Sequence, residues 1–228
     1  MERKATKLTA LDFLVAYFVA IAGTVGLTSL LRACGGFWLT SAGKLFSSIW
    51  VQDGLIALAV LLCLYLHGQG TSAIGLTRAK SAMSLARAVL YGALIYILMD
   101  IALVVMNLVF SDGVKAQSVE SYMKVGDSLG HIVFVVLSFA VVAPVAEELL
   151  FRGLLYNGLR NTMSSQGAMV LAALIFGLSH LDVQRALALS LGGYLLNLVS
   201  VKEESLWASI VAHGMWNLLM VLKFYAIL

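Results

Sequence analysis

The stretch LGHIVFVVLSFAVVAPVAEELLFRGLLYNGL, residues 129–159, decides the fold class of this chain. It is longer than the ~20 mostly apolar residues that a helix needs to cross a bilayer, yet Glu147, Glu148 and Arg152 lie near its middle. Ionisable groups there cost roughly 2.5–3.5 kcal/mol each, which makes them candidate functional groups. Glu148 and Arg152 share a helical face and are expected to pair, whereas Glu147 points about 100° away. Pro144 is expected to kink the helix and free a backbone carbonyl.

The composition extends this interpretation to all 228 residues, of which 61% are hydrophobic and 12% charged. Soluble domains have about 45–50% apolar and about 25% charged residues, so a soluble enzyme is excluded. A disordered chain is excluded by the same excess of apolar surface, and the long continuous apolar runs exclude a transmembrane β-barrel. We predict an all-α, polytopic transmembrane helical bundle of about seven (six to eight) spanning helices. The expected spans are residues 11–31, 48–67, 86–110, 129–159, 167–182, 184–200 and 205–225.

The charged residues outside these spans set the expected orientation. Arg3, Lys4 and Lys7 precede the first span, and Arg78 and Lys80 lie between the second and third. Basic loops stay in the cytoplasm, so we expect a cytoplasmic N-terminus and, with seven spans, an external C-terminus. The compact chain suggests a multi-pass protein of the bacterial cytoplasmic membrane. The connection over 111–128 is the longest extramembrane piece and has room for a short amphipathic helix.

Other features carry less information. The cysteines Cys34 and Cys63 are interpreted as apolar packing, with no disulfide framework and no metal cluster. Asp12 and His67 are expected near helix ends. The 15 Lys and Arg residues form no basic stripe, which argues against a nucleic-acid partner.

Two later spans carry polar residues in register with the acidic pair. Phe176 and His180 are four residues apart, as are His213 and Asn217, so each pair shares a helical face. Counting about 1.5 Å per residue from the turn at 160–167 places Glu147 and His180 at one depth, about 20 Å in. His213 and Asn217 enter from the same side. Each residue alone has a structural explanation, as a packed histidine or an ion pair; the complete set at matched depth predicts a functional centre.

Taken in order, Glu147-Glu148-x-x-x-Arg152, Phe176-x-x-x-His180 and His213-x-x-x-Asn217 resemble the motifs of the CPBP family. These are the CAAX-protease and bacteriocin-processing (Abi) intramembrane endopeptidases, related to the type II CAAX prenyl protease. The resemblance covers about residues 129–225, with Gly75-Leu76-Thr77-Arg78 as a weaker upstream feature. Because no loop is long enough for a second soluble domain, we expect one membrane-embedded domain over 1–228, in which 1–128 supply three helices without motifs and 129–225 form the catalytic core.

The residue types suit peptide hydrolysis by an activated water, and the resemblance implies the same roles. Glu147 is the candidate general base. His180 would hold and polarise the water, and His213 and Asn217 would donate hydrogen bonds to the developing oxyanion. Glu148 and Arg152 would support Glu147, with Phe176 beside them.

Metal dependence is open at this point. One alternative is a metal-free glutamate mechanism with no cofactor. The other is a metalloprotease in which Glu147, His180 and His213 hold Zn²⁺ with an open water position and Glu148 becomes the base.

The expected partners are small peptides or membrane-anchored proteins as substrates, together with membrane lipids. A non-catalytic scaffold, such as an immunity or regulatory protein that keeps the fold, is the main alternative function. A small proton-coupled carrier is a further one, although the sequence shows no inverted repeat.

Overall fold

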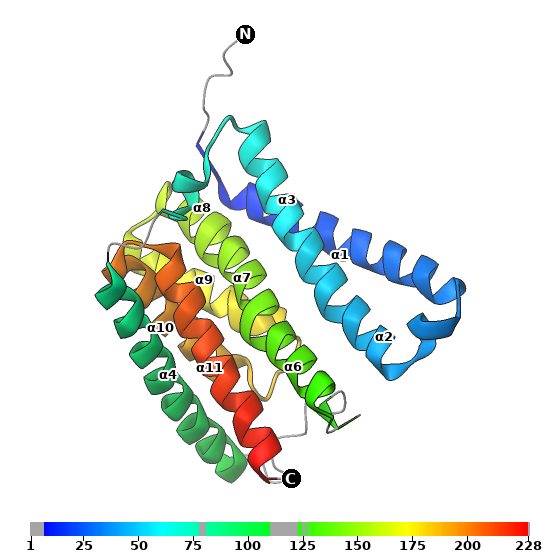
Figure 1. Ribbon diagram of the computed structural model, residues 1–228. Coiled ribbons are helices and arrows are strands. Elements are labelled where there is room, and N and C mark those ends of the chain that lie inside the picture. The colour runs from blue at the N-terminus through cyan, green and yellow to red at the C-terminus, as the bar shows by residue number, and fades with distance from the viewer. Residues whose placement is uncertain (1–6, 78–80, 110–122, 125, 127, 228) are drawn as a thin grey trace.

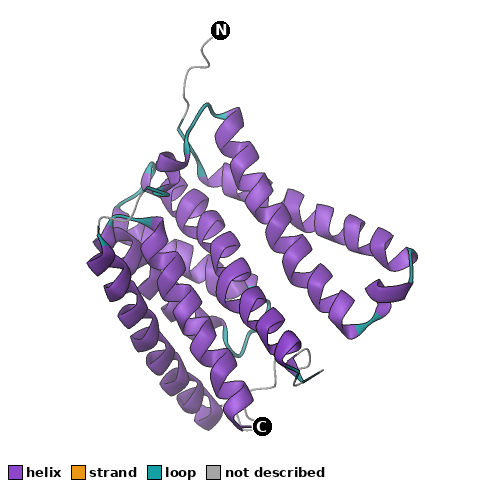
Figure 2. Cartoon of the chain, viewed as in Figure 1, coloured by secondary structure: helices purple, strands orange, loops and turns teal. Residues whose placement is uncertain are grey.

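The computed structural model describes residues 7–77, 81–109, 123–124, 126 and 128–227, and in this part of the chain all regular structure is helical (Figure 2). The predicted all-α fold is therefore confirmed. Arg3, Lys4, Arg78 and Lys80, with most of the 111–128 connection, lie outside the described residues.

Five helices of the described chain are long and apolar enough to cross a membrane. They are α1 (Ala10–Ala33), the continuous run of α2, η2 and α3 (Ser41–Leu66), α4 (Ala82–Val109), the run from α6 to α8 (Leu129–Arg160) and α11 (Leu206–Ile227). These five correspond to expected spans. Short 3₁₀ turns, η1 (Gly36–Leu39) and η3 (Thr71–Ile74), lie in the connections.

The other two expected spans form a shorter helical pair. The α9 helix (Ser165–Ser179) has only 15 residues, and α10 (Ala186–Glu203) contains the polar residues Ser190 and Asn197. The two pack closely, because Gly177 lies so near α10 that a Cβ would come within 2.3 Å of the Ala186 carbonyl oxygen. The α9 helix begins at the end of the bundle where α8 (Asn157–Arg160) lies, and α10 runs back towards the same end (Figure 1).

The Leu129–Arg160 helix departs twice from α-helical geometry. It begins as α6 (Leu129–Leu137), passes through the π-helical η4 (Ser138–Val142), continues as α7 (Ala143–Glu148) and becomes π-helical again in η5 (Leu149–Tyr156). A π-helical segment within an α-helix is frequently found at a functional site. Pro144, at the start of α7, is accommodated by the π segment before it.

The central helix of the bundle is α11. Half of its apolar window is buried within the protein, against 17–22% for the other four long helices. It packs along α4 and also contacts α10, α7 and η4 (Figure 1). The outer helices instead expose large apolar side chains such as Phe18, Leu58 and Leu108, as expected of surfaces that face lipid tails.

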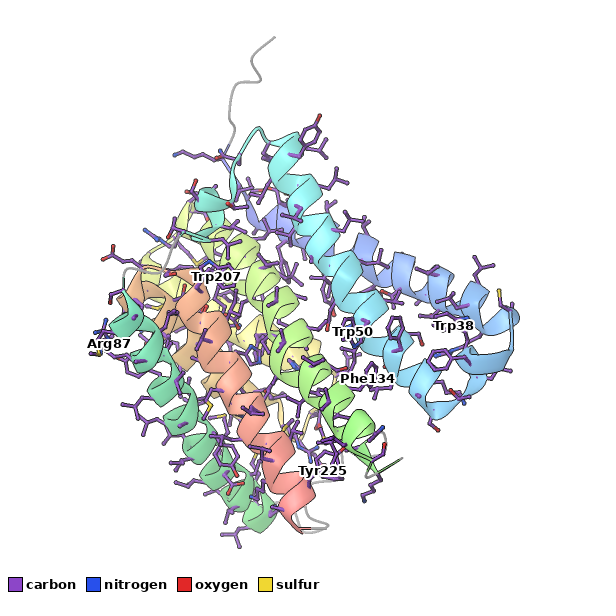
Figure 3. All side chains as sticks on the ribbon, viewed as in Figure 1. Trp38, Trp50, Arg87, Phe134, Trp207 and Tyr225 are labelled. Atoms are coloured by element: carbon purple, nitrogen blue, oxygen red, sulfur yellow. The ribbon has the colours of Figure 1, made fainter. Side chains whose placement is uncertain are left out.

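The hairpin of α1 and α3 (Gln52–Leu66) joins the rest of the bundle through aromatic contacts. Phe13 of α1 lies 5.5 Å from Phe151, centroid to centroid. Trp50 stacks on Phe134 at 6.1 Å and donates a 2.8 Å hydrogen bond to the Ser138 hydroxyl (Figure 3). The α3 helix also packs directly against α7, which carries the acidic pair.

Candidate active site

A cavity of about 980 Å³ lies between η2 (Ser47–Val51), α3, α4, α7, α11 and the turn after α9. Its volume is at the upper end of the range for small-ligand sites. The four predicted catalytic residues all line it, namely Glu147, His180, His213 and Asn217. The side chains that the sequence placed at one depth on three helices thus all face the same cavity.

The two adjacent glutamates have separate environments, as the helical geometry predicts. Glu147 faces the cavity, and its side chain is 24% exposed. Glu148 is fully buried, and its Oε1 accepts a 2.8 Å hydrogen bond from Arg152 Nη1. One carboxylate is therefore neutralised inside the protein and the other is open to the cavity.

Arg152 holds the interior side of the site. Its Nη2 donates a 2.7 Å hydrogen bond to the carbonyl of Gly193 on α10. Its guanidinium also lies 4.7 Å from the centre of the Phe176 ring, at cation–π distance. Gly193 is needed here, since a Cβ would come within 2.9 Å of that ring.

His213 connects the buried pair to the cavity. Its Nδ1 lies 2.8 Å from Glu148 Oε1, and its Nε2 lies 3.8 Å from Glu147 Oε2. A carboxylate can only accept, so Nδ1 of His213 is the donor, and in the tautomer with its proton on Nδ1 the ring presents an Nε2 lone pair to the cavity. Trp216 stacks on this ring with centroids 5.5 Å apart, and it lines the cavity as well.

His180 is oriented in the same manner. Its Nδ1 lies 2.8 Å from the carbonyl oxygen of Phe176, which can only accept, so the proton is on Nδ1 and Nε2 is free. The ring packs edge-on against Phe176 at 4.9 Å. The hydroxyl of Ser179 donates to the same carbonyl, so this serine is turned away from the cavity, as helical geometry predicts.

Asn217 occupies a position created by Pro144. In a π-helical register the N–H of residue 144 would donate to the carbonyl of Phe139, but proline has no N–H. The Asn217 side-chain amide donates to the Phe139 carbonyl instead, at 2.9 Å. The predicted freed carbonyl thus has a partner from α11, and this bond fixes the amide at the cavity wall.

The sequence analysis missed Asp53. This residue is 5% exposed, lines the cavity and interacts electrostatically with Glu147. Its position within an apolar span was the available signal, the same one that singled out Glu147. Asp100, a cavity residue on α4, pairs with Lys223 of α11.

The three candidate metal ligands match zinc ligands in donor type. Each histidine gives its Nδ1 proton to a carboxylate or a backbone carbonyl, which is the arrangement around metal-bound histidines. Glu147 and His213 are near each other. The donor atoms of Glu147, His180 and His213 are not found as a set within 4.8 Å of one another; in the described part of the chain, other residues form the set that is.

The fold and the site together define an integral membrane helical bundle with a carboxylate and two imidazoles facing an internal cavity. Residues 129–219, which include the three motifs from Glu147 to Asn217, match the family model described as type II CAAX prenyl endopeptidase Rce1-like. The predicted resemblance to the CAAX-protease (CPBP) family is therefore confirmed.

A curated relative points the same way. The "Putative membrane peptidase YdiL" of Bacillus subtilis (strain 168) is 23% identical over 114 residues, covering 50% of this chain and 46% of the relative. The chain thus spans about half the length of the curated relative that it matches. No solved structure matches the chain.

Proposed function

We propose that the protein is an intramembrane endopeptidase of the CPBP type that hydrolyses peptide bonds with a water activated by Glu147. The observation that carries the proposal is the 3.8 Å approach of Glu147 Oε2 to His213 Nε2 at the wall of a cavity that His180 and Asn217 also line. The match of residues 129–219 to a family of endopeptidases supports it.

The attacking water is held by acceptors. Glu147 and the Nε2 atoms of His180 and His213 can all accept hydrogen bonds. A water has two O–H groups, so it donates one to Glu147 and the other to one of the two Nε2 atoms, and its lone pairs point away, towards the substrate. As its oxygen bonds to the scissile carbonyl carbon, Glu147 takes the proton. When the C–N bond breaks, Glu147 returns that proton to the leaving amine.

Asn217 is the proposed donor to the oxyanion. One N–H of its amide is used by the Phe139 carbonyl, and an amide has a second N–H to offer. His213 in the tautomer with its proton on Nδ1 has no N–H left for the oxyanion, because that N–H donates to Glu148. Removing one such donor costs about 10²–10³ in rate in other hydrolases.

Glu148 and Arg152 are positioning residues in this proposal. They fix the His213 ring through its Nδ1, and Arg152 also holds α10 and Phe176. A ring fixed in this way needs no reorganisation during the reaction.

The same donors also suit a metalloprotease. Glu147, His180 and His213 would hold a divalent ion such as Zn²⁺, which would supply a Lewis acid for the water and the carbonyl. We propose the metal-free route because the third donor lies outside the 4.8 Å grouping. A chelator in the assay separates the two routes.

The proposed substrates are small peptides or membrane-anchored proteins, and we place the protein in the bacterial cytoplasmic membrane with its N-terminus in the cytoplasm. The Bacillus relative and the loop charges support this placement. Bacteriocin-type peptides, as in the Abi branch of the family, are one class to test.

The test is cleavage of a diverse library of peptides and membrane segments by purified protein in detergent, read by mass spectrometry. Glu147→Ala is the control, and each protein is assayed with and without a chelator. Products that only the wild type makes support the proposal and define the cleavage position. Identical profiles from two well-folded proteins would favour the scaffold alternative.

A further inference from the structure

A second cluster of reactive side chains lies where α1 begins and α3 ends. Asp12, Cys63 and His67 each offer one ligand atom, and these atoms all lie within 4.8 Å of one another. None of the three lines the cavity of the candidate active site. The sequence analysis considered these residues separately, Cys63 as apolar packing and the other two as helix-end residues, and the structure brings the three together.

Helical geometry explains why the cluster forms. Cys63 and His67 are four residues apart at the end of α3, so both side chains lie on one face. Asp12 lies in the first turn of α1 and faces them across the hairpin, with its Oδ1 3.2 Å from His67 Nε2. The Cys63 Sγ lies within 4.8 Å of ligand atoms of both Asp12 and His67.

The Asp12 carboxylate is held in place by its other oxygen. Oδ2 accepts hydrogen bonds from the Thr9 backbone N–H at 2.6 Å and from the Thr9 hydroxyl at 2.8 Å. Outer hydrogen bonds that fix a carboxylate in this way are typical of metal ligands. The side chains of His67 and Asp12 remain 24% and 15% exposed, so an ion has a path to them.

We propose that Asp12, Cys63 and His67 bind a divalent transition-metal ion of the Zn²⁺ class. Thiolate and imidazole ligands select such ions over Mg²⁺ and Ca²⁺. On binding, the Cys63 thiol releases its proton to solvent, and the thiolate and the Asp12 carboxylate balance the two positive charges of the ion. Water completes the four-coordinate shell.

The ion would act as a clamp between α1 and α3. The ends of the hairpin meet at this cluster, and α1 packs along η5, which carries Arg152. An ion that binds the folded hairpin and not the unfolded chain would stabilise the fold by mass action. The clamp is independent of the proposed peptidase function, because it uses none of the cavity residues.

Cobalt is the sharpest probe, because a thiolate bound to Co²⁺ gives a sulfur-to-metal charge-transfer band in the near ultraviolet. The chain has two cysteines, so only Cys63 and Cys34 can produce this band. Glu147, His180 and His213 contain no sulfur and stay silent even if they also bind the metal. The full chain in detergent is titrated with Co²⁺ and then with Zn²⁺, alongside Cys63→Ala and the matched control Cys34→Ala.

We expect a band that saturates at one Co²⁺ per chain, disappears when Zn²⁺ displaces the cobalt, persists in Cys34→Ala and is absent from Cys63→Ala. Zn²⁺ should raise the unfolding temperature of the wild type and of Cys34→Ala, but not that of Cys63→Ala. Absence of the band in the folded wild type, or its persistence in Cys63→Ala, would overturn the proposal.

His67→Ala covers the case in which Cys63→Ala does not fold. It keeps both cysteines and changes a partly exposed residue at the helix end. The affinity for Co²⁺, measured by the same band, should fall by at least about tenfold. An unchanged affinity would show that His67 is not a ligand and would contradict the site.

Discussion

Replacing Arg152 with methionine tests the interior of the site most severely. Arg152 is 2% exposed and Glu148 is 0% exposed, and their side chains meet at 2.8 Å. The substitution leaves the Glu148 carboxylate buried with its hydrogen bond from His213 but without its countercharge, and it removes the donor to the Gly193 carbonyl. Removing one member of a buried ion pair costs about 3–5 kcal/mol, and we expect a loss of that size in the free energy of unfolding.

Two further variants distinguish the cost of leaving a buried charge unpaired from the cost of losing the arginine side chain itself. In Glu148→Gln/Arg152→Met neither charge of the pair remains, so most of the lost stability should return. Arg160→Met is the matched control on the same helix, because Arg160 is exposed and lies 5.6 Å from the Tyr156 ring; it should cost at most about 1 kcal/mol. Unfolding in mixed micelles measures all three. A cost below about 1 kcal/mol for Arg152→Met, or an equal cost for the double variant, would refute this reasoning.

Two other predictions concern helix contacts. Glu203 accepts from Arg87 and Ser84 at 2.6–2.9 Å, which lowers the pKa of this carboxyl from 4.5 to about 2. This stabilisation is present above about pH 4.5 and is lost as the pH falls towards 2. Glu203→Gln should therefore destabilise by about 1–3 kcal/mol at neutral pH, with the gap closing in acid; a pH-independent gap in unfolding temperature would contradict this. Gly214→Ala would place a Cβ 2.5 Å from the Ala140 carbonyl oxygen, so it should cost about 1–3 kcal/mol, whereas Gly54→Ala, with open space around it, should be neutral or gain up to about 1 kcal/mol. Equal unfolding temperatures for the two alanine variants would count against the close approach of α11 to η4.

Helical periodicity alone predicted much of the site. The four-residue spacing gave the pairing of Glu148 with Arg152 and turned Glu147 to another face, and both are present in the structure. Counting residues from the 160–167 turn predicted that His180 would reach the depth of Glu147, and both line one cavity.

The remaining features depend on packing between helices that are distant in sequence. Asp53 and Glu147 line the same cavity because α3 packs against α7. The cluster of Asp12, Cys63 and His67 needs the hairpin that joins α1 to α3.

Backbone geometry was also beyond the sequence pattern. The apolar repeat of residues 129–159 does not distinguish an α-helix from one with two π segments, because an inserted residue changes the register locally and leaves the composition unchanged. Which carbonyl Pro144 leaves without a backbone donor, and which side chain can reach it, both depend on this local register. Only the structure identifies it as Asn217, bound to the Phe139 carbonyl.

The most direct test of the central claim is the rate at which Glu147→Gln cleaves a substrate of the wild type. The amide keeps the shape of the side chain but is a far weaker base, so the rate should fall by about 10²–10⁴ while the unfolding temperature stays near that of the wild type. A Glu147→Gln protein that is equally stable and cleaves at a rate within about tenfold of the wild type would contradict Glu147 as the general base.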